Sequence, residues 1–327
     1  MRLADEMRPY AYRQRVTRVL EGAVMTNLFF EPSTRSRISF GAAFNRLGGS
    51  SRDTTGFDFS SVVKGESMHD TARVVSGYSD IIVVRHPKAG TVQQLADATN
   101  LPVINGGDGI GEHPTQGLLD LYTLQRELPQ IDGMTIAMVG DLKFGRTVHS
   151  LARLLALNKN ITFNMVAPKG IQMPEDIVDY LKSVDRGHTV KQTEDLLEGI
   201  STADVVYSTR IQEERFPTKD EFEKYRGRYK IDKAMMEEHC KQRVLLLHPL
   251  PRDSREGSDE LSHDLNGLRN LGVFRQTDNG IPIRMALFAL LLGVEDKVHK
   301  NSRPVEWHVP ESIDPNPEAG RPLKEGE

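Results

Sequence analysis

Short apolar runs alternate with longer segments of helical periodicity along most of the chain. The runs are rich in Val, Ile, Leu and Met, and a short strand followed by a helix is typical of parallel α/β units. The predicted strands are Ala23–Phe30, Ile81–Val84, Pro102–Asn105, Thr135–Val139, Thr162–Ala167, Val205–Ser208 and Val244–Leu247, and the predicted helices are Arg35–Leu47, Ser67–Gly77, Gly117–Glu127, Arg146–Leu157 and Ile283–Leu292.

The length of 327 residues predicts two domains, because one domain takes about 150 residues. The expected fold is α/β, with two doubly wound parallel-sheet domains joined by interdomain helices. The loop-like segment Leu128–Gly133 separates a first domain, residues 1–128, from a second, residues 129–272. A C-terminal helix at about 273–293 returns to complete the first domain. The polar, proline-rich tail, residues 298–327, is expected to add little to the core.

Composition narrows the class of protein. There are 42 Lys and Arg residues against 46 Asp and Glu, and this acidic balance argues against nucleic acid or an anionic membrane as the main partner. The longest apolar run, Met285–Val294, is shorter than the about 20 residues that a membrane span needs. The N-terminus lacks the apolar core of a signal peptide. Cys240 is the one cysteine, which excludes an intrachain disulfide and a cysteine-based zinc cluster and favours a reducing cytoplasm.

Polar side chains follow most of the predicted strands, where ligands of parallel α/β sheets bind. The first such segment is Ser33-Thr34-Arg35-Ser36-Arg37, at the start of a helix whose free N–H groups and dipole suit an anion. A single Ser-x-Arg here would indicate a helix cap with solvated arginines. The whole cluster of hydroxyls and guanidinium groups favours a phosphate site.

Two further segments suit an anion or a small ligand. Arg85 ends a predicted strand, where it could form a surface ion pair or a bidentate contact with an oxyanion. The glycine-rich loop Asn105–Glu112 allows a close approach of the backbone to a ligand. It leads to His113 and Gln116 at a helix start, and a binding role is the favoured interpretation of both.

A fourth segment has two interpretations. Gly140, Gly145, Arg146 and Thr147 match the spacing of a nucleotide-binding P-loop, except that arginine stands where the motif has lysine. The missing lysine and the lack of a clear strand ending in a magnesium-binding Asp weaken that hypothesis. A nucleotide-binding protein nevertheless stays an alternative.

The last polar segments follow later strands. Arg210, Gln212 and Arg215 come after one strand, and the segment His248–Arg252 after the next. Prolines on both sides of Leu250 fix its backbone and leave its carbonyl as a rigid acceptor, although a simple turn is the structural alternative. Lys64 lies in a Ser/Gly-rich loop, where exposure to water is the default.

In combination, these motifs resemble the aspartate/ornithine transcarbamoylase family. The similarity extends from about Val24 to Leu292 and favours the aspartate branch, since ornithine members usually have His-Cys-Leu-Pro where this chain has His248–Pro251. It implies transfer of the carbamoyl group of carbamoyl phosphate to the amine of L-aspartate, an early step of pyrimidine biosynthesis. The segments that carry the resemblance are Ser33–Arg37, Lys64–Glu66, Arg85–Pro87, His113–Gln116, Gly140–Lys143, Gly145–Ser150, Thr209–Gln212 and His248–Arg252.

The resemblance also implies a role for each site residue and for the two domains. The first domain would bind carbamoyl phosphate and the second aspartate, with no cofactor and no metal. Ser36 stands where threonine is more usual and keeps the hydroxyl. Carbamoyl phosphate would be bound by Ser33, Thr34, Arg35, Ser36, Arg85, His113, Gln116, Leu250 and Pro251, with Arg35, Ser36, Arg85 and His113 catalytic, and aspartate by Lys64, Arg146, Arg210 and Gln212.

Assembly is a further implication of the resemblance. It predicts a cis peptide between Leu250 and Pro251, and a homotrimer with shared active sites in which Lys64 and Ser60 come from a neighbouring subunit. It is also compatible with regulatory chains. The segment before Phe29 is shorter than is usual in the family, so Met7–Leu20 is expected to take part of the role of a longer N-terminal helix.

Two other functions stay open from the sequence. Transfer to ornithine is disfavoured by Arg146 and Arg210, which would repel a cationic side chain. A catalytically silent scaffold would be expected to lose some anion ligands, yet every motif keeps its charged and hydroxyl groups.

Carbamoyl transfer needs fixed hydrogen-bond donors for a developing oxyanion rather than a protein nucleophile, which fits this set of residues.

Overall fold

A computed structural model describes the chain except residues 55–64, 256, 311–312, 314–315, 317–318 and 325–327. It contains two compact units, the first made of Met1–Thr115 and Asp278–Glu311, the second of Gln116–Thr277 and Ser312–Glu327. The division of function between residues 1–128 and 129–272 stays a prediction. Ser60 and Lys64 lie outside the described residues. No helix among the described residues is long and apolar enough to cross a membrane.

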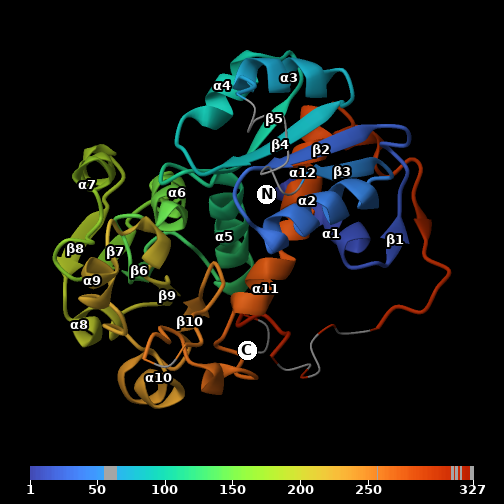
Figure 1. The fold of residues 1–327 in the computed structure, drawn as a ribbon. Coiled ribbons are helices and arrows are strands. Elements are labelled where there is room, and N and C mark those ends of the chain that lie inside the picture. The colour runs from blue at the N-terminus through green and yellow to red at the C-terminus, as the bar shows by residue number, and fades with distance from the viewer. Residues whose placement is uncertain (55–64, 256, 311–312, 314–315, 317–318, 325–327) are drawn as a thin grey trace. The chain divides into compact units, whose positions relative to one another are not determined.

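The first unit is built on a parallel sheet of strand order β3-β2-β4-β5. Its central strands are buried along most of their length, as expected of a sheet covered on both faces. Figure 1 shows α3 and α4 over one face and α1, α2 and α12 on the other. The elements are α1 (Arg2–Ala11), β1 (Arg15–Val16), β2 (Val24–Phe29), α2 (Thr34–Arg46), β3 (Ser50–Thr54), α3 (Met68–Ser76), β4 (Ile81–His86), α4 (Thr91–Asp97), β5 (Val103–Asp108), α12 (Gly280–Leu291), a 3₁₀ turn at Glu295–Lys297 and β11 (Arg303–Pro304).

Helix α1 packs against α12, which confirms that the N-terminal segment meets the returning C-terminal helix. Met7 and Tyr10 are the large buried side chains of α1. Phe288 of α12 stacks edge-on with Phe40 and Phe44 of α2, at centroid distances of 6.2 and 5.0 Å. These aromatic contacts hold α2 against α12.

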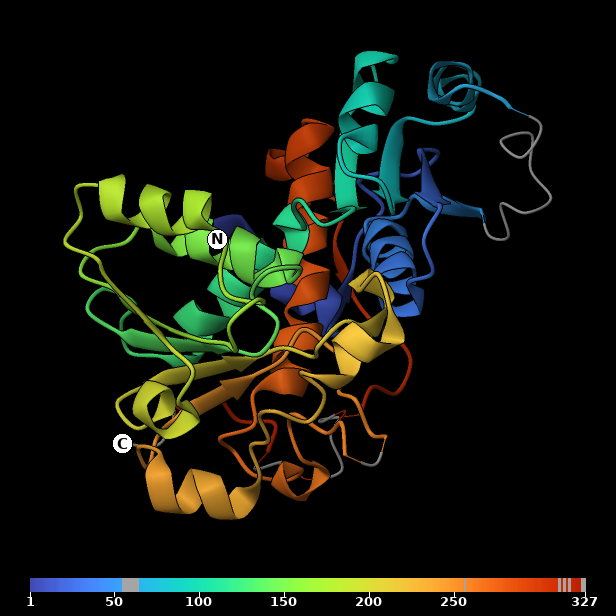
Figure 2. The same ribbon diagram turned by 60° about the vertical axis from the view of Figure 1, so that its left-hand side comes forward.

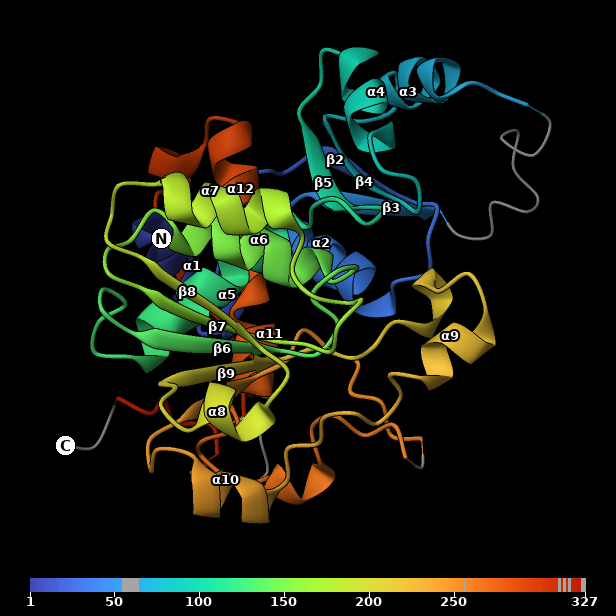
Figure 3. The same cartoon turned by 90° about the vertical axis from the view of Figure 1, so that its left-hand side faces the viewer.

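The second unit is built on a parallel sheet of order β10-β9-β6-β7-β8. Figures 2 and 3 show α6 and α7 on one face of this sheet and α8 on the other. Both units therefore confirm the predicted α/β class with parallel sheets. The elements are α5 (Pro114–Glu127), β6 (Thr135–Val139), α6 (Arg146–Leu155), β7 (Thr162–Val166), α7 (Glu175–Ser183), β8 (Thr189–Thr193), α8 (Leu196–Ile200), β9 (Val205–Ser208), a 3₁₀ turn at Glu213–Arg215, α9 (Lys219–Glu223), α10 (Lys233–His239), β10 (Leu245–Leu247), a 3₁₀ turn at His263–Leu265 and α11 (Val273–Asp278).

Part of the C-terminal tail is docked on the second unit. The Leu323 N–H donates to Glu127 Oε2 at 2.9 Å, and Arg243 Nη2 donates to the Leu323 carbonyl at 2.7 Å. Glu127 also forms a buried ion pair with Arg275, at 2.7 Å. The expectation that the tail adds little to the core is therefore wrong for these residues, because its backbone groups complete a buried network of charges.

Candidate active site

In the first unit, three neighbouring strand ends carry the predicted anion ligands. Strands β2, β4 and β5 are adjacent and parallel, so their carboxyl ends lie at one edge of the sheet. Phe29 pairs with Arg85 in the register, and the Phe30 N–H donates to the Arg85 carbonyl at 2.8 Å. The chain that enters α2 thus leaves the sheet beside Arg85.

The N-terminus of α2 offers hydroxyl and N–H groups. Ser33 is its N-cap residue, yet within the described part of the chain the Ser33 side chain makes no capping hydrogen bond. Thr34 and Arg35 are exposed and Ser36 is half-buried. The first turn has no acidic residue, so the positive end of the helix dipole is not compensated there. This arrangement suits a phosphate group, as the sequence predicts.

The side chain of Arg85 is held in a fixed orientation by two contacts. Its side chain is 11% exposed, its Nη1 donates to the Gly106 carbonyl at 3.2 Å, and its Nη2 lies 3.0 Å from Glu31 Oε2. A buried guanidinium with two fixed contacts loses little freedom when it binds an oxyanion. The geometry is that of a preorganised donor.

His113 completes the predicted set of the first unit. It follows β5 and is 4% exposed, with its Nδ1 at 3.5 Å from the Thr115 hydroxyl. The preceding loop turns back on itself through a bridge between Asp108 and Glu112. Gly109 has a φ of +55°, and a β-carbon there would collide with the backbone of Ala89, so glycine is required for this turn.

In the second unit, the predicted aspartate ligands also follow adjacent strands. The neighbouring parallel strands are β10, β9 and β6. Arg146 begins α6 after β6, and Arg210 and Gln212 follow β9. Gly140 has a φ of +117°, and a β-carbon there would collide with the Thr209 carbonyl, so the two loops approach each other closely at this glycine.

Asp141 links these loops. Its carboxylate accepts hydrogen bonds from the Phe144 N–H at 2.9 Å and the Gln212 N–H at 3.4 Å. The Gln212 side chain donates to the Phe144 carbonyl at 3.1 Å, which fixes its amide. Burial raises the pKa of Asp141 to about 6, and the backbone N–H groups oppose this rise. The sequence placed Asp141 in a motif but gave no sign of this linking role.

The raised pKa of Asp141 predicts a pH-dependent effect of Asp141→Asn on stability. Because the pKa rises from 3.8 unfolded to about 6 folded, the contribution of this group to stability is lost as pH rises through that range. Asparagine does not titrate, so the unfolding free energy of the variant minus that of the parent should increase by about 2 kcal/mol between pH 4.5 and pH 7. Urea unfolding at several pH values measures this difference, and a constant or decreasing difference contradicts the pKa assignment.

Arg210 is paired within its own loop. Its Nη1 donates to Glu214 Oε2 at 3.0 Å, and its Nη2 donates to Glu214 Oε1 at 2.5 Å. Burial alone would raise the pKa of Glu214, but these hydrogen bonds hold it below its usual value. Arg210 therefore has a guanidinium in the bidentate geometry that also suits a substrate carboxylate.

The segment after β10 has an unusual backbone. The Leu250–Pro251 peptide is cis, as predicted, and Leu250 has a φ of +58°. Its N–H donates to His248 Nδ1 at 2.8 Å, and His248 Nε2 lies 2.7 Å from Glu260 Oε1. Burial lowers the pKa of His248, and the hydrogen bond from the Leu250 N–H makes Nδ1 the acceptor of the ring. The backbone of Leu250 is thus fixed by a buried side chain.

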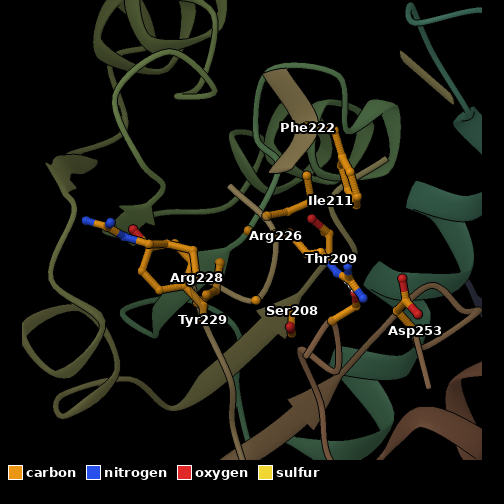
Figure 4. Close-up of a pocket in the computed structure, with 12 residues that line it drawn as sticks. Ser208, Thr209, Ile211, Phe222, Arg226, Arg228, Tyr229 and Asp253 are labelled. Atoms are coloured by element: carbon orange, nitrogen blue, oxygen red, sulfur yellow. Dashed lines mark hydrogen bonds between the residues drawn. The ribbon is translucent and has the colours of Figure 1, made fainter. Parts of the chain in front are cut away.

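A pocket lies beside these loops (Figure 4). It includes Thr209 and Asp253, but none of the residues predicted to bind substrate. Its position next to Arg210 makes it part of the surroundings of the predicted site rather than a separate one. Its lining residues are Val139, Gly140, Ser208, Thr209, Ile211, Phe222, Arg226, Gly227, Arg228, Tyr229, Asp253 and Ser258.

Sequence reasoning missed the partners that hold the site residues. Asp120 accepts from the predicted ligand Gln116 at 2.9 Å. The four-residue spacing of this pair on one helix was a usable signal. Gln276 is distant in sequence from His248 and Asp120, and no motif marked Gln276 or Glu260. Among the described residues, no group of three or more His, Cys, Asp or Glu side chains is arranged to hold a metal ion.

Comparison with known proteins gives a consistent result. Residues 1–126 match the model of the aspartate/ornithine carbamoyltransferase carbamoyl-P binding domain, and residues 132–291 that of the Asp/Orn binding domain. The aspartate carbamoyltransferase catalytic subunit of Saccharophagus degradans is 57% identical over 310 residues, which cover 94% of this chain and 91% of that protein.

Solved structures are similar over most of the chain. Aspartate transcarbamoylase of Trypanosoma cruzi in complex with carbamoyl phosphate and aspartate is 40% identical with a TM-score of 0.82, covering 88% of this chain and 90% of that one. The catalytic subunit of Methanocaldococcus jannaschii aspartate transcarbamoylase is 43% identical with a TM-score of 0.80, covering 90% and 94%.

Proposed function

Because the chain belongs to the aspartate/ornithine carbamoyltransferase family, we propose that it transfers the carbamoyl group of carbamoyl phosphate to the amine of L-aspartate. The products are N-carbamoyl-L-aspartate and phosphate, and the reaction is an early step of pyrimidine biosynthesis. The observation that carries this proposal is the placement of Arg146, Arg210 and Gln212 after adjacent strands of one sheet. Two guanidinium groups and an amide suit a substrate with two carboxylates.

Each predicted ligand of carbamoyl phosphate is assigned to one part of that substrate. In the first unit, Ser33, Thr34, Arg35 and Ser36 bind the phosphate at the start of α2. Arg85 and His113 polarise the carbamoyl carbonyl. Gln116 adds a contact to the phosphate, and the Leu250–Pro251 segment binds the carbamoyl end, where the Leu250 carbonyl accepts from the NH₂ group. None of these assignments involves a cofactor or a metal.

The reaction follows from these contacts. The neutral amine of aspartate attacks the carbamoyl carbon, and its electron pair forms the new C–N bond. Negative charge then develops on the carbonyl oxygen, where Arg85, His113 and the Ser36 hydroxyl stabilise it. Collapse of this intermediate breaks the bond between carbon and the bridging phosphate oxygen. The departing phosphate takes the amine proton. Orientation of the two bound substrates supplies much of the remaining acceleration.

Assembly and location belong to the same proposal. The family resemblance supports a cytoplasmic homotrimer in which Lys64 of a neighbouring subunit reaches the aspartate site. Lys64 would add a third cation for the dicarboxylate substrate. Binding of regulatory chains is compatible with this assembly.

An assay of two amine substrates tests the function. With carbamoyl phosphate, the protein should carbamoylate aspartate with a kcat/KM at least about 100-fold above that for ornithine, because Arg146 and Arg210 repel a cationic side chain. Chromatographic detection of the carbamoylated amino acid, together with phosphate release, measures both reactions. A preference for ornithine, or transfer to neither amine, contradicts the proposal. Magnesium-dependent ATP binding would instead support the P-loop alternative.

A further inference from the structure

A chain of buried hydrogen bonds runs through the second unit from Gln116 to Leu250. Gln116 Nε2 donates to Asp120 Oδ1 at 2.9 Å, and Gln276 Nε2 donates to the same oxygen at 2.6 Å. The His248 N–H donates to Gln276 Oε1 at 3.0 Å, and the Leu250 N–H donates to His248 Nδ1 at 2.8 Å. Both ends of this chain are residues assigned to carbamoyl phosphate.

The interior of the chain is closed to water. Asp120 is 0% exposed, and Gln276 and His248 are each 1% exposed. The second carboxylate oxygen of Asp120 accepts from the Tyr207 hydroxyl at 2.7 Å. A buried carboxylate with donors on both oxygens is held in one position, because a shift would leave charge without a partner.

Gln276 has one possible amide orientation in this chain. Asp120 can only accept, so it requires the Gln276 NH₂ group, and the His248 backbone N–H can only donate, so it requires the Gln276 carbonyl. A carboxylate or an alkyl side chain at this position would satisfy at most one of these partners. The amide therefore connects α5, which carries Gln116, to the segment that carries Leu250.

We propose that Gln276 is a positioning residue for the carbamoyl group of the substrate. Through Asp120 it fixes the amide of Gln116, and through His248 it fixes the backbone of Leu250 in its left-handed conformation. The proposal rests on the proposed function. It adds that recognition of the carbamoyl NH₂ depends on a side chain that does not touch the substrate.

Acetyl phosphate provides a specific probe of this role. It carries a methyl group where carbamoyl phosphate carries NH₂, so it offers no hydrogen to the Leu250 carbonyl. Loss of the Gln276 amide should therefore strongly lower kcat/KM for carbamoyl phosphate. The inhibition constant of acetyl phosphate should change only slightly. A merely structural role would weaken both by the same factor.

The test compares Gln276→Met with the parent protein. We expect kcat/KM for carbamoyl phosphate to fall about 10- to 100-fold, while the inhibition constant of acetyl phosphate changes less than about threefold. The matched control is Thr123→Val, which removes a buried hydroxyl of α5 that donates to the Leu119 carbonyl at 2.7 Å. This control should lower the melting temperature and keep the discrimination between the two phosphates.

The outcomes separate this proposal from the proposed function. If the parent protein does not carbamoylate aspartate, the proposed function fails. If the parent is active and Gln276→Met loses affinity for both phosphates equally, or for neither, the positioning role is wrong. Where Gln276→Met does not fold, Gln276→Asn replaces it, because the shorter side chain keeps an uncharged amide that cannot reach Asp120 and the His248 N–H together. The same loss of discrimination is then expected, and its absence overturns the proposal.

Discussion

Arg85→Ala is expected to lower kcat/KM for carbamoyl phosphate by about 10³-fold or more. Arg85 lies almost buried at the end of β4, with its guanidinium held by the Gly106 carbonyl and by Glu31. Alanine removes a fixed positive charge and the donors that face the developing oxyanion. Steady-state measurement of phosphate release at saturating aspartate determines the change.

Two control variants separate lost chemistry from lost structure. Arg85→Lys keeps the charge without the planar fork, so its kcat/KM should fall between those of the parent and of Arg85→Ala. Glu31→Gln changes the carboxylate that faces Arg85, at 3.0 Å, and leaves the guanidinium in place. Its kcat/KM should stay far above that of Arg85→Ala at a similar melting temperature. A loss below about tenfold in Arg85→Ala would exclude the assigned role of this residue.

The sequence predicted the buried strands well and missed the exposed edge strands β3 and β8. The predicted strand Thr135–Val139 is identical to β6, and the runs around Ile81 and Val205 match β4 and β9 closely. These strands are buried on both faces, so their sequences are continuously apolar. The missed strands β3 and β8 lie at sheet edges and are largely exposed. Their polar sequences have no apolar pattern. These segments are strands because their backbones pair with β2 and β7, which the sequence of the segment itself does not indicate.

The ligand candidates could be predicted because chemistry collects at the ends of parallel strands. Arg85 and Arg210 each follow a strand that was recognisable from its apolar run. The residues that hold the ligands could not be found in this way. Gln276 lies 156 residues from Asp120 in the chain, and their hydrogen bond exists only through the fold. Buried polar partners of this kind have no local periodicity or motif.

The C-terminal tail shows a second case in which the structure could not be predicted from composition. Its proline content and polarity indicate a segment without a core, yet Leu323 is 8% exposed. Its backbone donates to Glu127, whose ion pair with Arg275 lies inside the second unit. Docking of this kind depends on two or three specific contacts. Average composition over the tail cannot reveal them.

Arg210→Ala is expected to lower kcat/KM for aspartate by about 10²- to 10³-fold, mainly through a higher KM. The Arg210 guanidinium already binds a carboxylate in bidentate geometry, that of Glu214, at 2.5 and 3.0 Å. Two charge-assisted hydrogen bonds to a substrate carboxylate would be lost with the side chain. Because the assigned ligands of the phosphate are other residues, inhibition by acetyl phosphate should change little.

Succinate separates binding of the carboxylates from chemistry in this variant. It has both carboxylates of aspartate and no amine, so it binds without reacting. The inhibition constant of succinate should rise in Arg210→Ala by about the same factor as the KM of aspartate. Glu214→Gln is the matched control, because it keeps the arginine and weakens only its internal partner, so aspartate affinity should change far less. If succinate binds Arg210→Ala as tightly as the parent, Arg210 does not bind the dicarboxylate, and the aspartate site must be assigned to other residues.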